Sequence, residues 1–234
     1  MASPPAVAQR KTQDLTPPLD DTGGEVGYRN SFVGRGGRAA YAGGMSSTNH
    51  LHRPRLVIVP GLHGSGAEHW QSWLHGQVAG SVRVEQDEWS TPDLDRWSER
   101  VADTIAAHGP GPHVIVAHSF GCLAAVHALQ RRPALDVSQL LLVAPAEPNR
   151  FDVALRLPPS RLAARSCVVA SDNDPWMSAT QAHAWAQRWG SDWINLGNAG
   201  HINVDSGYGP FPLAREWAAG ALNRIDTRPW RAAA

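Results

Sequence analysis

The 234-residue sequence predicts an α/β fold in which a mostly parallel sheet is covered by helices on both faces. From residue 55 onward, short apolar runs typical of buried strands alternate with segments of helical period. The apolar runs are continuous, as expected for strands that are covered on both faces. The alternation of the two element types therefore indicates the fold class, and the sequence contains no internal repeat.

The expected strands are short and end at turn signals. Residues 55–60 (RLVIVP) form an apolar run that leads into Pro-Gly, and residues 114–118 form a second run before a serine-containing turn. Further strands are expected over residues 82–84, 139–144, 166–170 and 193–196.

The expected helices lie between these runs. Over residues 93–108, apolar residues from Leu94 to Ile105 recur at helical spacing, and Thr91-Pro92 supplies a cap and a first turn. Residues 120–131 predict a helix of small residues directly after the serine turn. The other helices are expected over residues 70–76, 178–189 and 212–222.

Residues 1–50 differ in composition from the rest of the chain. They are rich in Pro, Gly, Ser and Arg and show no apolar period of 2 or 3.6. Such a segment cannot bury enough apolar surface to offset chain entropy, so we expect a disordered N-terminal extension over residues 1–50. One domain is expected over residues 51–234. The alternative is a misassigned start, with translation beginning at Met45.

Composition excludes several classes of function. The 21 basic and 21 acidic residues give zero net charge, which argues against nucleic-acid partners and acidic membranes. Apolar runs are far shorter than the ~20 residues of a membrane span, and a secretory h-region is absent from the sequence. Two distant cysteines, Cys122 and Cys167, favour a reducing compartment, so we expect a cytoplasmic protein. Lys11 is the only lysine, which argues against P-loop, Schiff-base and Tyr-Lys chemistry.

The strongest local motif is VIVAHSFGCLAA, in which a buried strand enters a small-x-Ser-x-Gly turn and a helix follows. Small residues are required there because a serine on a strained turn leaves no room for bulky neighbours. The turn presents the Ser119 hydroxyl at a helix N-terminus, which favours negative charge. Ser119 is therefore the candidate nucleophile, and the alternative is a simple helix-capping role.

A carboxylate follows the predicted strand over residues 166–170, in the stretch SDNDPWM. The end of a parallel strand lies at the sheet edge where sites of α/β proteins form. Asp174 is the candidate acid because Asp-Pro followed by the apolar Trp176 and Met177 resembles the acid loop of α/β-hydrolases. Asp172 is the alternative, and either residue can also serve only a turn or a helix cap.

A histidine follows the last predicted strand, in the stretch NLGNAGHIN. Gly197 and Gly200 allow the loop to bend back toward the serine. His201 is therefore the candidate base, since it is the only histidine after the acid loop that follows a strand. His183 lies in a predicted helix and is expected to be a surface or packing residue.

The loop PGLHGSG after the first strand has two interpretations. In acyl-transfer hydrolases this loop and the residue after the nucleophile supply backbone N–H donors to an oxyanion, here Leu62 and Phe120. The alternative is a dinucleotide site, since Glu85 or Asp87 follows about 20 residues later. The spacing of the glycines is not G-x-G-x-x-G, which favours the oxyanion interpretation.

Together these motifs resemble the α/β-hydrolase superfamily, and within it the small serine hydrolases related to retinoblastoma-binding protein 9 and YdeN. The matching stretches are RLVIVPGLHGSGAEHWQSW, QDEWSTPDLDRW, VIVAHSFGCLAA, LLVAPAEP, SDNDPWM and NAGHIN, in the family's order. The resemblance implies a three-layer α/β-hydrolase-type sandwich with Ser119, His201 and Asp174 as the triad. It does not extend to a retinoblastoma-type partner, because the sequence has no Leu-x-Cys-x-Glu segment.

We therefore expect a serine hydrolase that cleaves a small carboxylic ester, or an amide, without a cofactor or a metal. About twenty proline-rich residues separate the strands over 139–144 and 166–170, so no cap domain is expected and the site is expected to be open. Trp176 and His63 are candidates for its wall. Trp70, Trp73 and Trp89 are further candidates for the wall, and the alternative for Trp73, like the expectation for Trp97, is that it fills the core between helix and sheet.

Two other classes of function remain open at this stage. The first is an interaction protein that keeps the fold without catalysis, and the second is a nicotinamide-dependent oxidoreductase. A metal enzyme is disfavoured, because His63, His69 and His75 are spaced by six and no H-E-x-x-H occurs. The expected partner is a small acyl substrate, and the sequence does not predict an oligomeric state.

Overall fold

A computed structural model of the protein describes residues 55–226. The expected disordered extension and the possible start at Met45 lie outside the described residues. The expected α/β-hydrolase domain is therefore considered through residues 55–226.

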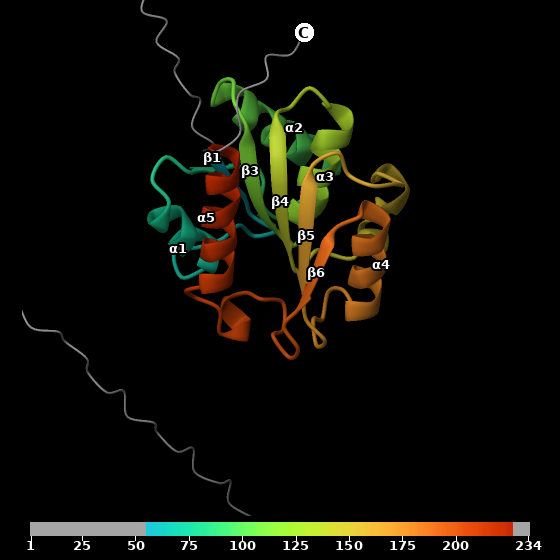
Figure 1. The fold of residues 1–234 in the computed structure, drawn as a ribbon. Coiled ribbons are helices and arrows are strands. Elements are labelled where there is room, and N and C mark those ends of the chain that lie inside the picture. The colour runs from blue at the N-terminus through green and yellow to red at the C-terminus, as the bar shows by residue number, and fades with distance from the viewer. Residues whose placement is uncertain (1–54, 227–234) are drawn as a thin grey trace, which may run out of the picture. The chain divides into compact units, whose positions relative to one another are not determined.

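Six parallel strands form one sheet in the order β2-β1-β3-β4-β5-β6 (Figure 1). Because every neighbouring pair is parallel, the carboxyl ends of all strands meet at one edge of the sheet. The strands are β1 (Arg55–Val59), β2 (Val82–Arg83), β3 (His113–His118), β4 (Val137–Val143), β5 (Arg165–Ala170) and β6 (Asp192–Asn195).

Helices cover both faces of this sheet, which confirms the predicted three-layer architecture (Figure 1). In β1, Val57 and Val59 pack in the core under α2, α3 and α4, whereas Leu56 and Ile58 pack in the core under α1 and α5. The alternation follows from the period of two in a strand. The helices are α1 (Trp70–Gln77), α2 (Leu94–Ala107), α3 (Phe120–Arg131), α4 (Ala179–Trp189) and α5 (Pro212–Asp226).

The connection between β4 and β5 contains only two short 3-10 helices, η1 (Pro148–Phe151) and η2 (Ala154–Arg156). No cap domain is therefore inserted between these strands, as the sequence predicted. At the carboxyl edge of the sheet, the loops that directly follow the strands form the surface.

The predicted elements match the structure apart from their ends. β4 begins at Val137 rather than residue 139, and α5 continues to Asp226 rather than residue 222. Polar or charged residues at these ends, such as Ser138, weaken the apolar pattern from which boundaries are predicted.

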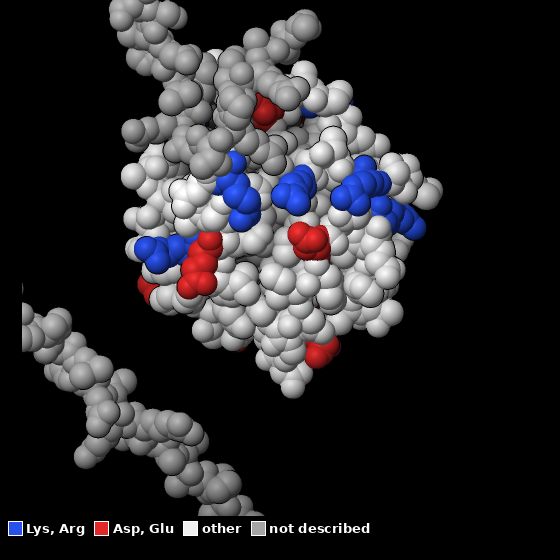
Figure 2. Space-filling view, viewed as in Figure 1, with Lys and Arg blue, Asp and Glu red and all other residues white. Residues whose placement is uncertain are grey.

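Charged side chains of both signs occur on the face seen in Figure 2. Basic side chains lie in a band across this face, and acidic side chains lie mostly below this band. Within the described part of the chain, no helix is long and apolar enough to cross a membrane.

The close approach of α3 to the end of β1 depends on a glycine. A Cβ added to Gly121 would lie 2.2 Å from the carbonyl oxygen of Pro60 and 2.7 Å from that of Val59. Both contacts are with backbone, which cannot move aside as a flexible side chain can. Any larger residue here therefore separates α3 from β1.

We predict that Gly121→Ala lowers the free energy of unfolding by about 1–3 kcal/mol, the usual effect of overpacking a core. The control is Gly76→Ala in α1, where an added Cβ meets no atom within 4 Å. That variant is expected to be neutral or more stable by up to ~1 kcal/mol, because alanine favours helix. Urea unfolding measures both, and equal stabilities of the two variants would contradict the packing argument.

Candidate active site

The turn between β3 and α3 holds Ser119 in a strained conformation, with φ 53° and ψ −127°. Such a positive φ is rare for a residue other than glycine and persists only where its surroundings impose it. Here the Ser119 N–H donates to the carbonyl oxygen of Val143 (3.1 Å). Gly61 lies against the turn, since a Cβ added there would be 2.7 Å from the Cβ of Ser119.

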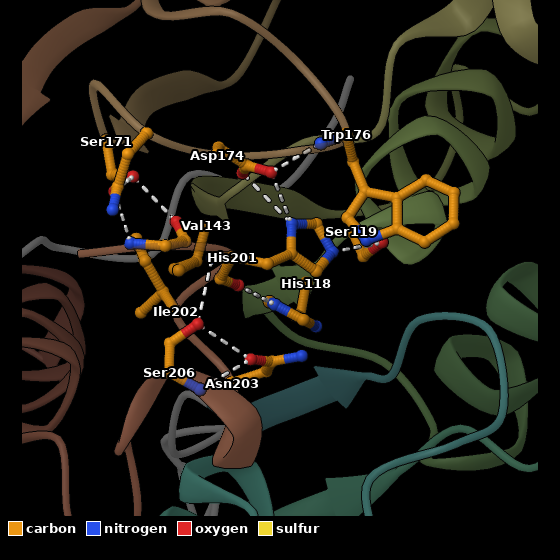
Figure 3. Close-up of polar contacts among 12 residues, drawn as sticks. His118, Ser119, Val143, Ser171, Asp174, Trp176, His201, Ile202, Asn203 and Ser206 are labelled. Carbon is orange, nitrogen blue, oxygen red and sulfur yellow. Dashed lines mark hydrogen bonds and ion pairs between the residues drawn. The ribbon is translucent and has the colours of Figure 1, made fainter. Parts of the chain in front are cut away.

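Three of the predicted site residues meet at the carboxyl edge of the sheet (Figure 3). The Nε2 atom of His201 lies 2.9 Å from the Ser119 Oγ, and its Nδ1 lies 3.0 and 2.9 Å from the two Asp174 oxygens. A carboxylate only accepts hydrogen bonds, so Nδ1 carries the imidazole proton and Nε2 accepts from the serine hydroxyl. The His201 and Asp174 side chains are 8% and 3% exposed.

The structure distinguishes the two candidate acids. Asp174 faces the imidazole and also accepts a hydrogen bond from the Trp176 N–H (2.8 Å). Asp172 points elsewhere and accepts from the side-chain amide of Asn195 (2.7 Å), which ties its loop to β6. The geometry therefore favours Asp174.

The acid loop and the histidine loop are joined by hydrogen bonds (Figure 3). The Ser171 hydroxyl donates to the carbonyl oxygen of Gly200 (2.6 Å), and the Gly200 N–H donates to the Asn173 side-chain oxygen (2.7 Å). On the other side, the His201 N–H donates to the Ser206 hydroxyl (3.0 Å). These bonds determine the distance between Asp174 and His201.

Two buried side chains support the histidine loop from beneath. His118 donates from Nε2 to the carbonyl oxygen of His201 (2.9 Å), and Trp70 donates from its indole to that of Ile202 (2.8 Å). The first contact was not predicted from the sequence. A histidine that ends an otherwise apolar strand must find a hydrogen-bond partner when buried, and this is the signal that could have revealed it.

The loop after β1 holds one of the two predicted oxyanion donors, Leu62, and the other, Phe120, is the first residue of α3. The His63 N–H donates to the carbonyl oxygen of Trp89 (2.9 Å), and the Gly64 N–H donates to that of Gly61 (3.0 Å). Within residues 55–226, the N–H groups of Leu62 and Phe120 make no hydrogen bond. Phe120 directly follows Ser119, and Leu62 follows Gly61, which lies against the Ser119 side chain.

Gln71, which is fully buried, links this loop to the sheet. Its amide nitrogen lies 3.0 Å from the carbonyl oxygen of Val59, and its side-chain oxygen accepts from Ser65 (2.6 Å). No role for Gln71 was predicted from the sequence. Its effect is to hold the loop at the end of β1 in one conformation.

Residues 56–218 match a family model described as serine hydrolase. The chain belongs to the serine hydrolase family. None of the curated proteins matched the sequence.

Solved structures also resemble this serine hydrolase. A protein described as a YdeN-like hydrolase from Pectobacterium atrosepticum is 38% identical, with a TM-score of 0.70, and the match covers 74% of this chain and 92% of that one. The ydeN gene product of B. subtilis is 18% identical, with a TM-score of 0.61 and coverage of 73% and 99%. The type II thioesterase BorB from the borrelidin biosynthetic cluster is 16% identical, with a TM-score of 0.55 and coverage of 74% and 94%. The first match confirms the expected resemblance to YdeN-like hydrolases, and the other two show the shared fold.

Of the residues predicted to line the site, Trp176 lies beside His201, His63 is exposed and Trp70 is buried in the core. The Trp176 ring lies 6.1 Å from the His201 ring and is 46% exposed, at the rim of the site (Figure 3). His63 has a positive φ of 63° and an exposed side chain, which makes no ring contact or hydrogen bond within the described residues. Trp70, a candidate for the wall, is instead fully buried in the core, where its indole supports the histidine loop.

The described residues contain no group of three or more His, Cys, Asp or Glu side chains that could hold a metal ion.

Two further histidines, His69 and His118, form a chain of edge-on and tilted ring contacts that ends at His201. The His118 ring lies 5.0 Å from the His69 ring and 4.9 Å from the His201 ring. Burial lowers the pKa of His118 well below its usual value, and the neighbouring histidines lower it further. Burial, with Arg83 and His201 nearby, lowers the pKa of His69 to about 4. His69 and His118 are thus both neutral at pH 7.

We predict that His69 makes the protein less stable in acid. Between about pH 6.5 and 4 the unfolded chain binds a proton at this position that the folded chain does not, so the free energy of unfolding falls as pH falls through that window. The His69 Nδ1 also caps α1 by accepting from the Gln71 N–H (3.1 Å), and asparagine can replace this acceptor. His69→Asn should therefore reduce the pH slope of stability by up to ~1.4 kcal/mol per pH unit.

Urea unfolding between pH 4 and 7 measures this slope. The control is His75→Asn, which removes an exposed histidine from the same helix. A slope in His69→Asn that equals the slopes of the wild type and the control would contradict the prediction.

Proposed function

We propose that this hydrolase cleaves a small carboxylic ester through an acyl-enzyme on Ser119. The observation that carries the proposal is the continuous hydrogen-bonded chain from Asp174 through His201 to the Ser119 hydroxyl. The serine hydrolase family match and the YdeN-like hydrolase support hydrolysis as the reaction class. The roles of these three residues are inferred from this geometry.

In the first step, the Ser119 oxygen attacks the ester carbonyl carbon and His201 takes the hydroxyl proton at Nε2. Asp174 accepts from Nδ1 in the ground state, so it keeps the imidazole in the required tautomer and stabilises the imidazolium that forms. The neutral state of His118 favours this step, because a second positive charge beside the imidazolium would raise its energy.

In the tetrahedral intermediate the carbonyl oxygen carries negative charge. We assign its stabilisation to the N–H groups of Leu62 and Phe120, which have no other acceptor within residues 55–226. The N-terminus of α3 adds a favourable dipole. A donor of this kind typically lowers the barrier by about 3 kcal/mol.

The intermediate collapses when His201 gives its proton to the leaving alcohol. Water then attacks the acyl-enzyme with His201 again as base, which releases the acid and restores Ser119. The short connection between β4 and β5 leaves this site without a cap domain, which suits a small-molecule acyl substrate.

We predict that a fluorophosphonate probe labels the wild type at Ser119 and does not label Ser119→Ala. Such probes phosphonylate a serine only when a base activates it, so labelling reports the proposed chemistry rather than the fold. Gel fluorescence with mass-spectrometric mapping of the labelled peptide measures it. Equal labelling of both proteins would overturn the assignment of the nucleophile, and no labelling of either would favour a non-catalytic interaction protein.

The assignment of the acid has a matched control. Asp174→Asn should reduce kcat for 4-nitrophenyl acetate by roughly 10³- to 10⁴-fold, because the amide no longer holds the productive tautomer. Asp172→Asn alters a carboxylate two residues away that binds only Asn195 in the described structure, and it should retain most activity. A larger loss in Asp172→Asn than in Asp174→Asn would contradict the proposed role.

A further inference from the structure

The short helix η1 lies beside the nucleophile turn. The Phe151 ring, at its end, packs edge-on against the Phe120 ring with centroids 5.0 Å apart. Phe120 directly follows Ser119 and is fully buried, so this contact fixes η1 next to the predicted oxyanion donors. The start of η1 is also fixed, because the Glu147 carboxylate accepts hydrogen bonds from the backbone and side-chain N–H groups of Asn149 (3.2 and 2.8 Å).

Arg150, in this helix, faces the rim of the site. Its guanidinium carbon lies 5.7 Å from the centre of the Trp176 ring, and that ring in turn lies 6.1 Å from the His201 ring. Arg150 and His201 are therefore both neighbours of the Trp176 ring. Trp176 is 46% exposed and Arg150 is exposed, so the stacked pair borders the solvent-facing entrance to Ser119 (Figure 3 shows Trp176 beside Ser119 and His201).

The charge of Arg150 is not neutralised by an acidic side chain. Within residues 55–226 it forms no ion pair, whereas Arg156 in η2 pairs with Asp95. Two acids of the neighbouring loops are bonded elsewhere, Asp174 to His201 and Glu147 to Asn149. Stacking on an indole leaves the edge of a guanidinium, with its planar fork of N–H donors, available to a carboxylate.

We propose that Arg150 is a specificity-determining residue that binds a carboxylate on the substrate. This inference rests on the proposed ester hydrolysis and adds a substrate class, namely small esters that carry a free carboxylate several atoms from the scissile bond. The ester carbonyl lies at Ser119 while the carboxylate meets the guanidinium across Trp176. The guanidinium and the carboxylate need not form two parallel hydrogen bonds, because the positive charge of Arg150 alone attracts an anion to this rim.

The test compares each carboxylate-bearing ester with a neutral analogue in which a carboxamide replaces the carboxylate. For the acyl side, the pair is the mono-4-nitrophenyl ester of adipic acid and the same ester with a terminal carboxamide. For the leaving-group side, the pair is 4-acetoxybenzoate and 4-acetoxybenzamide. The measured quantity is the ratio of kcat/KM for the carboxylate to kcat/KM for its carboxamide analogue, in wild type, Arg150→Gln and Arg150→Lys.

We expect the ratio to fall about tenfold in Arg150→Gln in the arm that matches the natural position of the carboxylate, and to be largely kept in Arg150→Lys. Added NaCl should lower the wild-type ratio but not that of Arg150→Gln, because exposed charges are screened. The matched control is Arg188→Gln. Arg188 lies near the C-terminal end of α4, and its guanidinium carbon is 4.6 Å from the centre of the Trp185 ring. This control variant should leave both ratios unchanged.

The outcomes separate this inference from the function on which it rests. Unchanged ratios in Arg150→Gln in both arms, with the neutral esters still cleaved, overturn the role of Arg150 and leave ester hydrolysis standing. Equal losses in Arg188→Gln and Arg150→Gln also overturn it, since the effect would then come from net charge alone. Failure of the wild type to cleave any of the four esters counts against the proposed function itself.

Discussion

The site depends on one close backbone approach, in which the turn at Ser119 and the start of α3 pack against the loop that follows β1. Gly121 lies against the carbonyl groups of Val59 and Pro60, and Gly61 lies against Ser119 itself. This packing leaves room for a serine at a φ of 53°, which isolated chains rarely adopt. The strain is balanced by a sheet whose strands β1, β3 and β4 are buried on both faces. The fold thus presents a hydroxyl group at the edge of the sheet without a flexible loop.

The histidine reaches the hydroxyl by a different route, through hydrogen bonds between loops. The loop after β6 is bonded to the loop after β5 by Ser171 and Asn173, and its carbonyl groups rest on His118 and Trp70. Because these partners are neutral, they hold the loop without adding charge beside the imidazole. The electrostatic partner of His201 is therefore Asp174 alone among these contacts.

Much of this arrangement could be predicted from the sequence, because continuous apolar runs and small-residue turns have few structural alternatives. The turn at Ser119 is indicated by small residues between a strand and a helix. The histidine loop is indicated by its glycines and by its position after the acid loop. Asp174 and Asp172 could not be separated in this way, since both follow β5 and only the direction of their side chains differs. Trp70 was a candidate for the wall because tryptophans suit both pockets and cores, and only packing shows that its indole supports Ile202. The residues that His118, Gln71 and Arg150 contact lie in other segments of the chain. No local sequence pattern therefore shows which residues these partners are.

The central claim is that Asp174 keeps the His201 proton on Nδ1 and leaves Nε2 free to accept from Ser119. Nitrogen NMR of protein labelled with ¹⁵N-histidine tests it most directly, with the His201 signals assigned by their loss in His201→Gln. At neutral pH, we expect a protonated Nδ1 and an unprotonated Nε2 in the wild type. A His201 ring that carries its proton on Nε2 in the wild type would rule out this role of Asp174.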